Sequence, residues 1–127
     1  MKRLVLVLMI GLASACEHNT APVAGLLTVS LTTPNAGGDG AILLNISGPA
    51  ALTSVSAPSG LRLFAQPPPF GTTNRFVLTG TIPAGAILTI GVADVNKATA
   101  YTATIQQVAT PGYQLRALTG YSLKVSE

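Results

Sequence analysis

Few side chains in this sequence could carry out acid–base or nucleophilic chemistry. The internal acidic residues are Asp39 and Asp94, and the only histidine is His18. Glycoside hydrolysis needs two carboxylates facing one bond, whereas both aspartates stand in turn sequences, where Asp readily caps its own turn. A Ser or Thr nucleophile needs a positioned base, and His18 lies two residues from Cys16 in a segment without hydrophobic periodicity. We therefore expect no enzyme activity and no catalytic residue.

Metal ligands are equally scarce. Zinc needs three or four His, Cys or carboxylate ligands, which the chain after its N-terminal segment cannot supply, and glycine-rich phosphate loops are absent. The alternative is a weak calcium site in which Asp39, Asp94 and Asn96 act with backbone carbonyls. Two ordinary polar turns account for the same residues. The sequence therefore predicts no metal and no cofactor, with calcium as the weaker alternative.

Two loops carry the residues best suited to bind a ligand. Residues 66–74 are proline-rich and contain Phe70, and residues 110–120 contain Tyr113 and Arg116. An exposed aromatic side chain on a rigid loop can stack on a sugar ring or fill a pocket of a partner. The competing interpretation is that both aromatic rings close the ends of the fold. Phe70, Tyr113 and Arg116 are the candidate binding residues.

Residues 1–15 have the pattern of a targeting segment. Lys2 and Arg3 precede an apolar run over residues 4–12, and small residues follow at positions 13–15. A positive start, a short apolar run and an A-x-A pattern are typical of a secretory signal peptide. A transmembrane helix needs about 20 apolar residues, and this run is shorter. We expect a helical signal peptide over residues 1–15 and an exported protein.

The residues around the only cysteine sharpen this expectation. The segment Leu12-Ala13-Ser14-Ala15-Cys16 resembles the lipobox of bacterial lipoproteins. The resemblance implies cleavage before Cys16, diacylglycerol on its thiol and acylation of the new amino group. The segment departs from the family pattern at Ala13, where Leu is most frequent. We expect attachment to a membrane of the bacterial cell envelope through acyl chains on Cys16, because several chains on one residue anchor a protein stably. Without acylation the expectation is a secreted protein.

The composition after cleavage is that of a single neutral domain. Removing 15 of 127 residues leaves 112, within the usual size of one domain. Five cations stand against four carboxylates, a formal charge of +1 without any basic patch, so we expect no nucleic-acid partner. Many Thr, Ser and β-branched residues favour strands.

Alternating apolar and polar residues predict eight short strands separated by turn sequences. The expected strands span residues 26–32, 41–47, 52–57, 61–65, 75–79, 86–93, 99–108 and 121–125. No segment has the periodicity of a convincing amphipathic helix, so the sequence predicts an all-β fold, a single antiparallel β-sandwich over residues 25–127. Residues 16–24 are expected to connect the lipid to this domain.

The short apolar strands, the turns that end in glycine and the closing strand Tyr121-x-Leu123-x-Val125 resemble cohesin-type and immunoglobulin-like modules of bacterial surface proteins. A shared fold carries no residue-level function across. We expect a non-catalytic binding or structural module, with an envelope protein or polysaccharide as its partner. The alternatives are a carbohydrate-binding or cohesin-like protein-interaction module and, in a different class, a secreted hydrolase accessory or enzyme.

Overall fold

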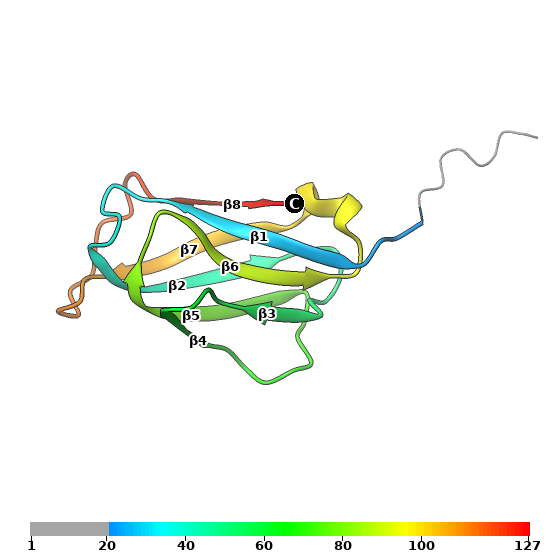
Figure 1. The fold of residues 1–127 in the computed structure, drawn as a ribbon, viewed down its shortest axis with the longest axis horizontal. Coiled ribbons are helices and arrows are strands. Elements are labelled where there is room, and N and C mark those ends of the chain that lie inside the picture. Colours follow the sequence, from blue (N-terminus) through cyan, green and yellow to red (C-terminus); the bar gives the residue numbers. More distant parts are fainter. Residues whose placement is uncertain (1–20) are drawn as a thin grey trace, which may run out of the picture.

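The computed structural model describes residues 21–127, which form two antiparallel β-sheets packed face to face (Figure 1). The strands are β1 (Gly25–Thr32), β2 (Asp39–Ser47), β3 (Ser54–Ser56), β4 (Leu61–Phe64), β5 (Thr73–Ile82), β6 (Gly85–Val92), β7 (Thr102–Ala109) and β8 (Ser122–Ser126). One sheet has the order β3-β6-β1-β8 and the other the order β4-β5-β2-β7. The predicted all-β sandwich of eight short strands is confirmed.

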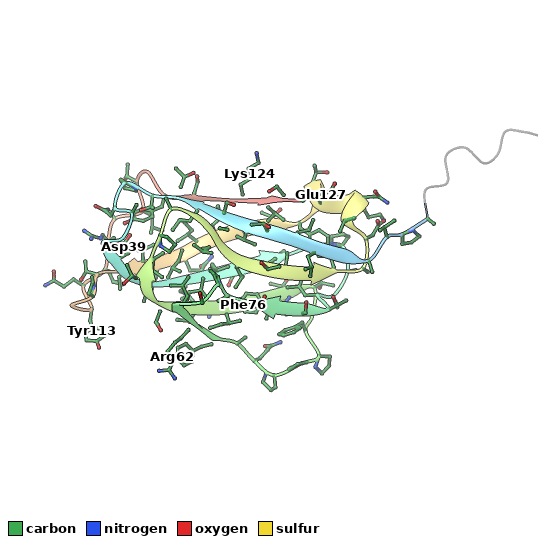
Figure 2. The ribbon with its side chains drawn as sticks, viewed as in Figure 1. Asp39, Arg62, Phe76, Tyr113, Lys124 and Glu127 are labelled. Atoms are coloured by element: carbon green, nitrogen blue, oxygen red, sulfur yellow. The ribbon has the colours of Figure 1, made fainter. Side chains whose placement is uncertain are left out.

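The core lies between the two sheets and follows from the alternation in the strands. In β1, Leu27, Val29 and Leu31 are buried, while Thr28 and Ser30 face outward. Phe76 of β5 lies fully buried near the middle of the sandwich (Figure 2). The other fully buried large side chains come from β2, β5 and β6: Ile42, Leu44, Ile46, Leu78, Ile82, Ile87, Leu88, Ile90 and Val92.

The outer faces of the two sheets differ in chemistry. On the β3-β6-β1-β8 sheet, cross-strand neighbours form the hydroxyl row Ser56, Thr89, Thr28 and Ser126. On the β4-β5-β2-β7 sheet, the corresponding central row is Phe64, Val77, Leu43 and Gln107. Only the second sheet therefore presents a row of apolar side chains outward.

The segment after β6 departs from the prediction. Residues 99–101 were expected to begin a strand, but Val95–Ala100 form a 3₁₀ helix, η2, and β7 begins at Thr102. The Asp94 side chain accepts a hydrogen bond from the Asn96 N–H at 3.0 Å and so caps this helix. The strand prediction was wrong at these residues. Thr99 and Ala100 lie in η2, and Tyr101 is extended but donates its N–H to the Ala98 carbonyl at 3.2 Å instead of pairing with β2. Within residues 21–127, no helix combines the length and the apolar character needed to span a membrane.

The sandwich has two distinct ends (Figure 1). At the entry end lie residues 21–24, η2 and the C-terminus. At the loop end lie the β1–β2 loop (residues 33–38) and the β7–β8 loop (residues 110–121). The chain therefore enters the domain at the end opposite these two loops.

Candidate functional site

A buried polar network organises the loop end around Asp39, whose exposed fraction is 1%. Its Oδ1 accepts a hydrogen bond from Arg116 Nε at 2.6 Å, and its Oδ2 accepts one from the Tyr121 hydroxyl at 2.7 Å. Arg116 Nη2 also donates to the Gly38 carbonyl at 3.0 Å, and Asn35 Nδ2 donates to the Tyr121 oxygen at 2.9 Å. Both carboxylate oxygens are therefore satisfied by protein donors, as a buried charge requires.

This network joins the two loops of the loop end. Arg116 belongs to the β7–β8 loop, and Asp39 begins β2 directly after the β1–β2 loop. The structure thus places the candidate Arg116 in an ion pair with a second candidate, Asp39. Its Nε and Nη2 groups already have partners, and its role in ligand binding stays a prediction.

The three candidate calcium ligands do not come together. Asp94 and Asn96 lie at the entry end, whereas Asp39 lies at the loop end (Figures 1 and 2). A hydrogen bond from the Val23 N–H, aided by the Asn96 N–H and the Lys97 charge, lowers the pKa of Asp94. In the part of the chain that the structure describes, no three His, Cys, Asp or Glu side chains cluster as metal ligands.

Phe70 packs against the core. Its ring meets that of Phe76 edge to face, with centroids 6.2 Å apart and an interplanar angle of 62°. The buried Asn74 fixes this end of the proline-rich loop, because its side chain accepts from the Gly71 N–H at 2.9 Å and donates to the Gly71 carbonyl at 2.7 Å. The loop therefore turns Phe70 inward, where it fills space beside the core.

Tyr113 has the opposite environment, with 92% of its side chain exposed at the tip of the loop end (Figure 2). Its N–H donates to the Thr110 carbonyl at 2.9 Å, and the Thr110 N–H donates to the Gln114 carbonyl at 2.8 Å. These bonds close a tight turn that continues β7. Tyr113 has a φ of 68°, a left-handed conformation that disfavours a residue with a Cβ. A constrained turn therefore presents an exposed aromatic ring to solvent.

A hollow of about 400 Å³ is lined by this turn and by residues of the second sheet. Its lining comes from β2, β4, β5 and the turn: Gly40, Ala41, Phe64, Thr79, Gly80, Thr110, Pro111 and Tyr113. Phe64 is 49% exposed and was not among the predicted site residues. The alternation in β4, with Leu61 and Leu63 inward, could have indicated a phenylalanine on the outward face.

A second, smaller hollow of about 200 Å³ adjoins the first and shares Ala41 with it. We use the term apolar strip for the outward side chains of both hollows: Ala41, Leu43, Phe64, Val77, Ala109, Tyr113 and Leu115. Leu115 is 67% exposed, in a segment that forms a bridge with Ala109. The apolar strip therefore runs from the Tyr113 turn across β2 to β5 and β4.

No protein-family model, curated protein or solved structure matches this chain. The candidate site is thus defined by its own geometry.

The charges around the apolar strip have one sign. The guanidinium carbon of Arg62 lies 5.5 Å from the centre of the Phe64 ring. Arg75, one cross-strand row beyond Val77, donates from Nε to Asn45 Oδ1 at 3.3 Å. The side-chain carboxylates of residues 21–127 belong to Asp39, Asp94 and Glu127. Asp39 is buried, Asp94 caps η2 at the entry end and Glu127 ends the chain there, so the strip is cationic at its margin.

The predicted lipidation site, Cys16, lies outside the described residues. Its acylation and the signal peptide over residues 1–15 therefore stay predictions. The structure does describe where the following chain joins the domain, at Val23 and β1.

Proposed function

We propose that this protein is a lipid-anchored, non-catalytic binding module of the bacterial cell envelope, with an immunoglobulin-like or cohesin-like sandwich as its folded part. The observation that carries the proposal is the position of the chain entry, opposite the exposed Tyr113 turn (Figure 1). With acyl chains on Cys16, the entry end faces the membrane. The loop end then faces away from it and the apolar strip lies on the side of the domain, where a partner has access.

The attachment of the entering chain supports this orientation. The Val23 N–H donates to Asp94 Oδ1 at 3.1 Å, and the Val95 N–H donates to the Val23 carbonyl at 2.8 Å. The chain is therefore bound to the sandwich from Val23 onward. Only six residues separate Val23 from Cys16, so an anchor on Cys16 holds this end, and not the loop end, near the lipid.

The lining of the candidate site favours binding over catalysis. Tyr113 is the only residue with a titratable side chain among those that line the larger hollow. The nearby Asp39 carboxylate is buried and has protein donors on both oxygens. A general base needs a free acceptor within reach of the substrate proton. Aromatic rings, methyl groups and Thr hydroxyls instead provide contact area and hydrogen bonds.

The test of the anchor is the intact mass of the protein purified from membranes. We expect the mass of residues 16–127 plus about two or three acyl chains, because stable attachment takes more than one chain. The Cys16→Ser variant should lack the acyl mass and leave the membrane fraction. A Ser14→Ala variant, which keeps the cysteine and a small residue before it, should remain acylated. A wild-type mass equal to the unmodified chain from Cys16 would contradict the proposal.

A further inference from the structure

We propose that the larger hollow binds an acidic polysaccharide, with a sugar ring between Phe64 and Tyr113 and its carboxylate beside Arg62. This inference rests on the proposed binding function and names the ligand class of the same site. It follows from three properties of the hollow: two exposed aromatic rings, two Thr residues in its lining, and a positive margin at which no carboxylate of residues 21–127 lies.

The aromatic rings come from different parts of the chain and meet at one site. Phe64 ends β4, and Tyr113 lies in the β7–β8 loop, yet both line the same hollow. Large aromatic side chains usually bury most of their area, and an exposed apolar group rimmed by polar residues marks a binding surface. The flat apolar face of a sugar ring fits such a pair, because its C–H groups pack against the rings.

The conformation of Tyr113 supports a role in binding. At a φ of 68°, glycine would be the residue of lowest strain. The backbone strain of a tyrosine in this conformation costs about 1–2 kcal/mol. Packing offsets little of this cost, because 92% of the side chain is exposed. Strain of this kind collects at ligand-binding positions. Neither the packing nor the backbone conformation of the domain favours a tyrosine at this position, whereas contact of its ring with a ligand does.

Polar groups accompany the rings. Thr79 faces outward from β5, and Thr110 starts the turn that carries Tyr113. The turn lies close against β2, because a Cβ on Gly40 would come within 2.9 Å of Pro111 Cα. These contacts fix the turn that carries Tyr113 against β2, and within the turn the Thr110 hydroxyl accepts a hydrogen bond from the Gln114 N–H at 3.1 Å. A hollow of this size is within the range of small-ligand sites, about 300–1,000 Å³.

The charge of the margin selects an acidic ligand. Arg62 is exposed beside Phe64, and Arg75 lies farther along the same face. Among residues 21–127, neither forms an ion pair with a carboxylate. A second copy of this chain on the same face would bring these cations toward one another, which costs energy. An anionic polymer has the complementary charge. The adjoining hollow at Leu43 and Leu115 extends the contact, so the site accommodates more than one sugar unit.

The test uses the full-length protein in detergent and three polymers. Polygalacturonate and alginate are the acidic probes, and fully methyl-esterified polygalacturonate has the same ring without its charge. In affinity electrophoresis we expect an acidic probe to bind at least tenfold more tightly than the ester. Phe64→Ala and Tyr113→Gly should each weaken that binding about tenfold or more, as expected for a central contact. Arg62→Gln should weaken binding of the acidic probe and leave binding of the ester unchanged.

Controls separate binding from folding. Leu26→Ala removes a 62%-exposed side chain from the other sheet and should not change binding. Tyr113→Gly relieves the positive φ, so its urea midpoint should be no lower than that of the wild type.

Four results would overturn the inference. They are no binding of either acidic polymer, equal binding of the ester, no effect of the two aromatic variants, or a dimer in sedimentation equilibrium that Phe64→Ala dissociates. The acyl mass on Cys16 is measured separately. An acylated protein that binds no sugar refutes only this inference, and a sugar-binding protein without acyl chains refutes only the anchor.

Discussion

Asp39 is the single residue on which the loop end depends most. It is an ionisable group with an exposed fraction of 1%, and the Arg116 and Tyr121 side chains occupy its two oxygens. Removing one partner of a buried ion pair leaves the other charge without compensation, which costs far more than the pair contributes. The position of the Tyr113 turn therefore depends on a buried carboxylate whose two oxygens are occupied by protein donors.

We expect Asp39→Asn to lower the free energy of unfolding by about 3 kcal/mol. This value is at the lower end for a broken buried ion pair, because the Arg116 side chain is 30% exposed and water still solvates part of its charge. Urea unfolding at neutral pH measures the change. Tyr121→Phe removes only the hydroxyl that donates to Asp39 and should cost about 1.5 kcal/mol. A loss below 1 kcal/mol for Asp39→Asn would show that the pair does not hold the loops together.

The sequence identified several of these residues but not their pairing. Asp39 and Arg116 are 77 positions apart, and no local pattern indicates that two such residues meet. Phe64 illustrates another reason. The prediction of binding aromatics rests on loop sequences, although the alternation in residues 61–64 places Phe64 on the outward face of a strand. The tight turn at Tyr113 could not be predicted either, because its left-handed backbone conformation is typical of glycine and not of tyrosine.

Among the elements, β2 and η2 meet through the residues that follow them, Gly48 and Tyr101. Tyr101 is the C-cap of η2 with 5% of its surface exposed, and burial raises the pKa of its hydroxyl. A Cβ on Gly48 would overlap the Tyr101 ring. The end of β2 therefore needs a residue without a side chain, and the aromatic ring covers it.

We expect Gly48→Ala to destabilise the protein by about 1–3 kcal/mol, the usual cost of overpacking. Gly71→Ala is the matched control, because its new Cβ would come no closer than 3.8 Å to another residue and its φ is not positive. It should change stability by less than about 0.5 kcal/mol. Thermal unfolding compares the two variants. Equal midpoints would mean that the Tyr101 ring moves aside freely.

The elements were predicted best where alternation alone decides them. All eight strands were anticipated, but β5 runs from Thr73 to Ile82, beyond the expected residues 75–79. The pairing of β5 with β2 continues from Ser47–Thr73 to Asp39–Ile82, past the apolar pattern. Strand ends thus depend on the neighbouring strand, whose register a single sequence does not reveal.

Across the domain as a unit, Asp94 joins the entering chain to the sandwich. Its carboxylate accepts from the N–H groups of Val23 and Asn96, and its pKa lies below its usual value of 3.8. A lowered pKa in the folded state means that the ionised group contributes stability above pH 3.8. That contribution is lost as the pH falls through the lowered pKa.

We therefore expect Asp94→Ala to be less stable than the wild type at pH 6, with a difference that shrinks as the pH falls below 3.8. Urea unfolding of both proteins between pH 2 and pH 6 measures it. Lys97→Ala should leave most of the pH dependence in place, because the Val23 hydrogen bond is the larger cause of the shift. A difference that stays constant over this range would exclude Asp94 as the titrating group.

The attachment of Val23 to the sandwich also limits the distance between the lipid and the loop end in an acylated protein. Seven residue steps from Cys16 to Val23 span at most about 25 Å, and the eight residues of β1 add about 27 Å along the sandwich. A polymer held at the loop end would thus lie within about 50 Å of the lipid headgroups. Such a protein would fasten a glycan layer that touches the bilayer, and a layer that begins farther out would remain unattached.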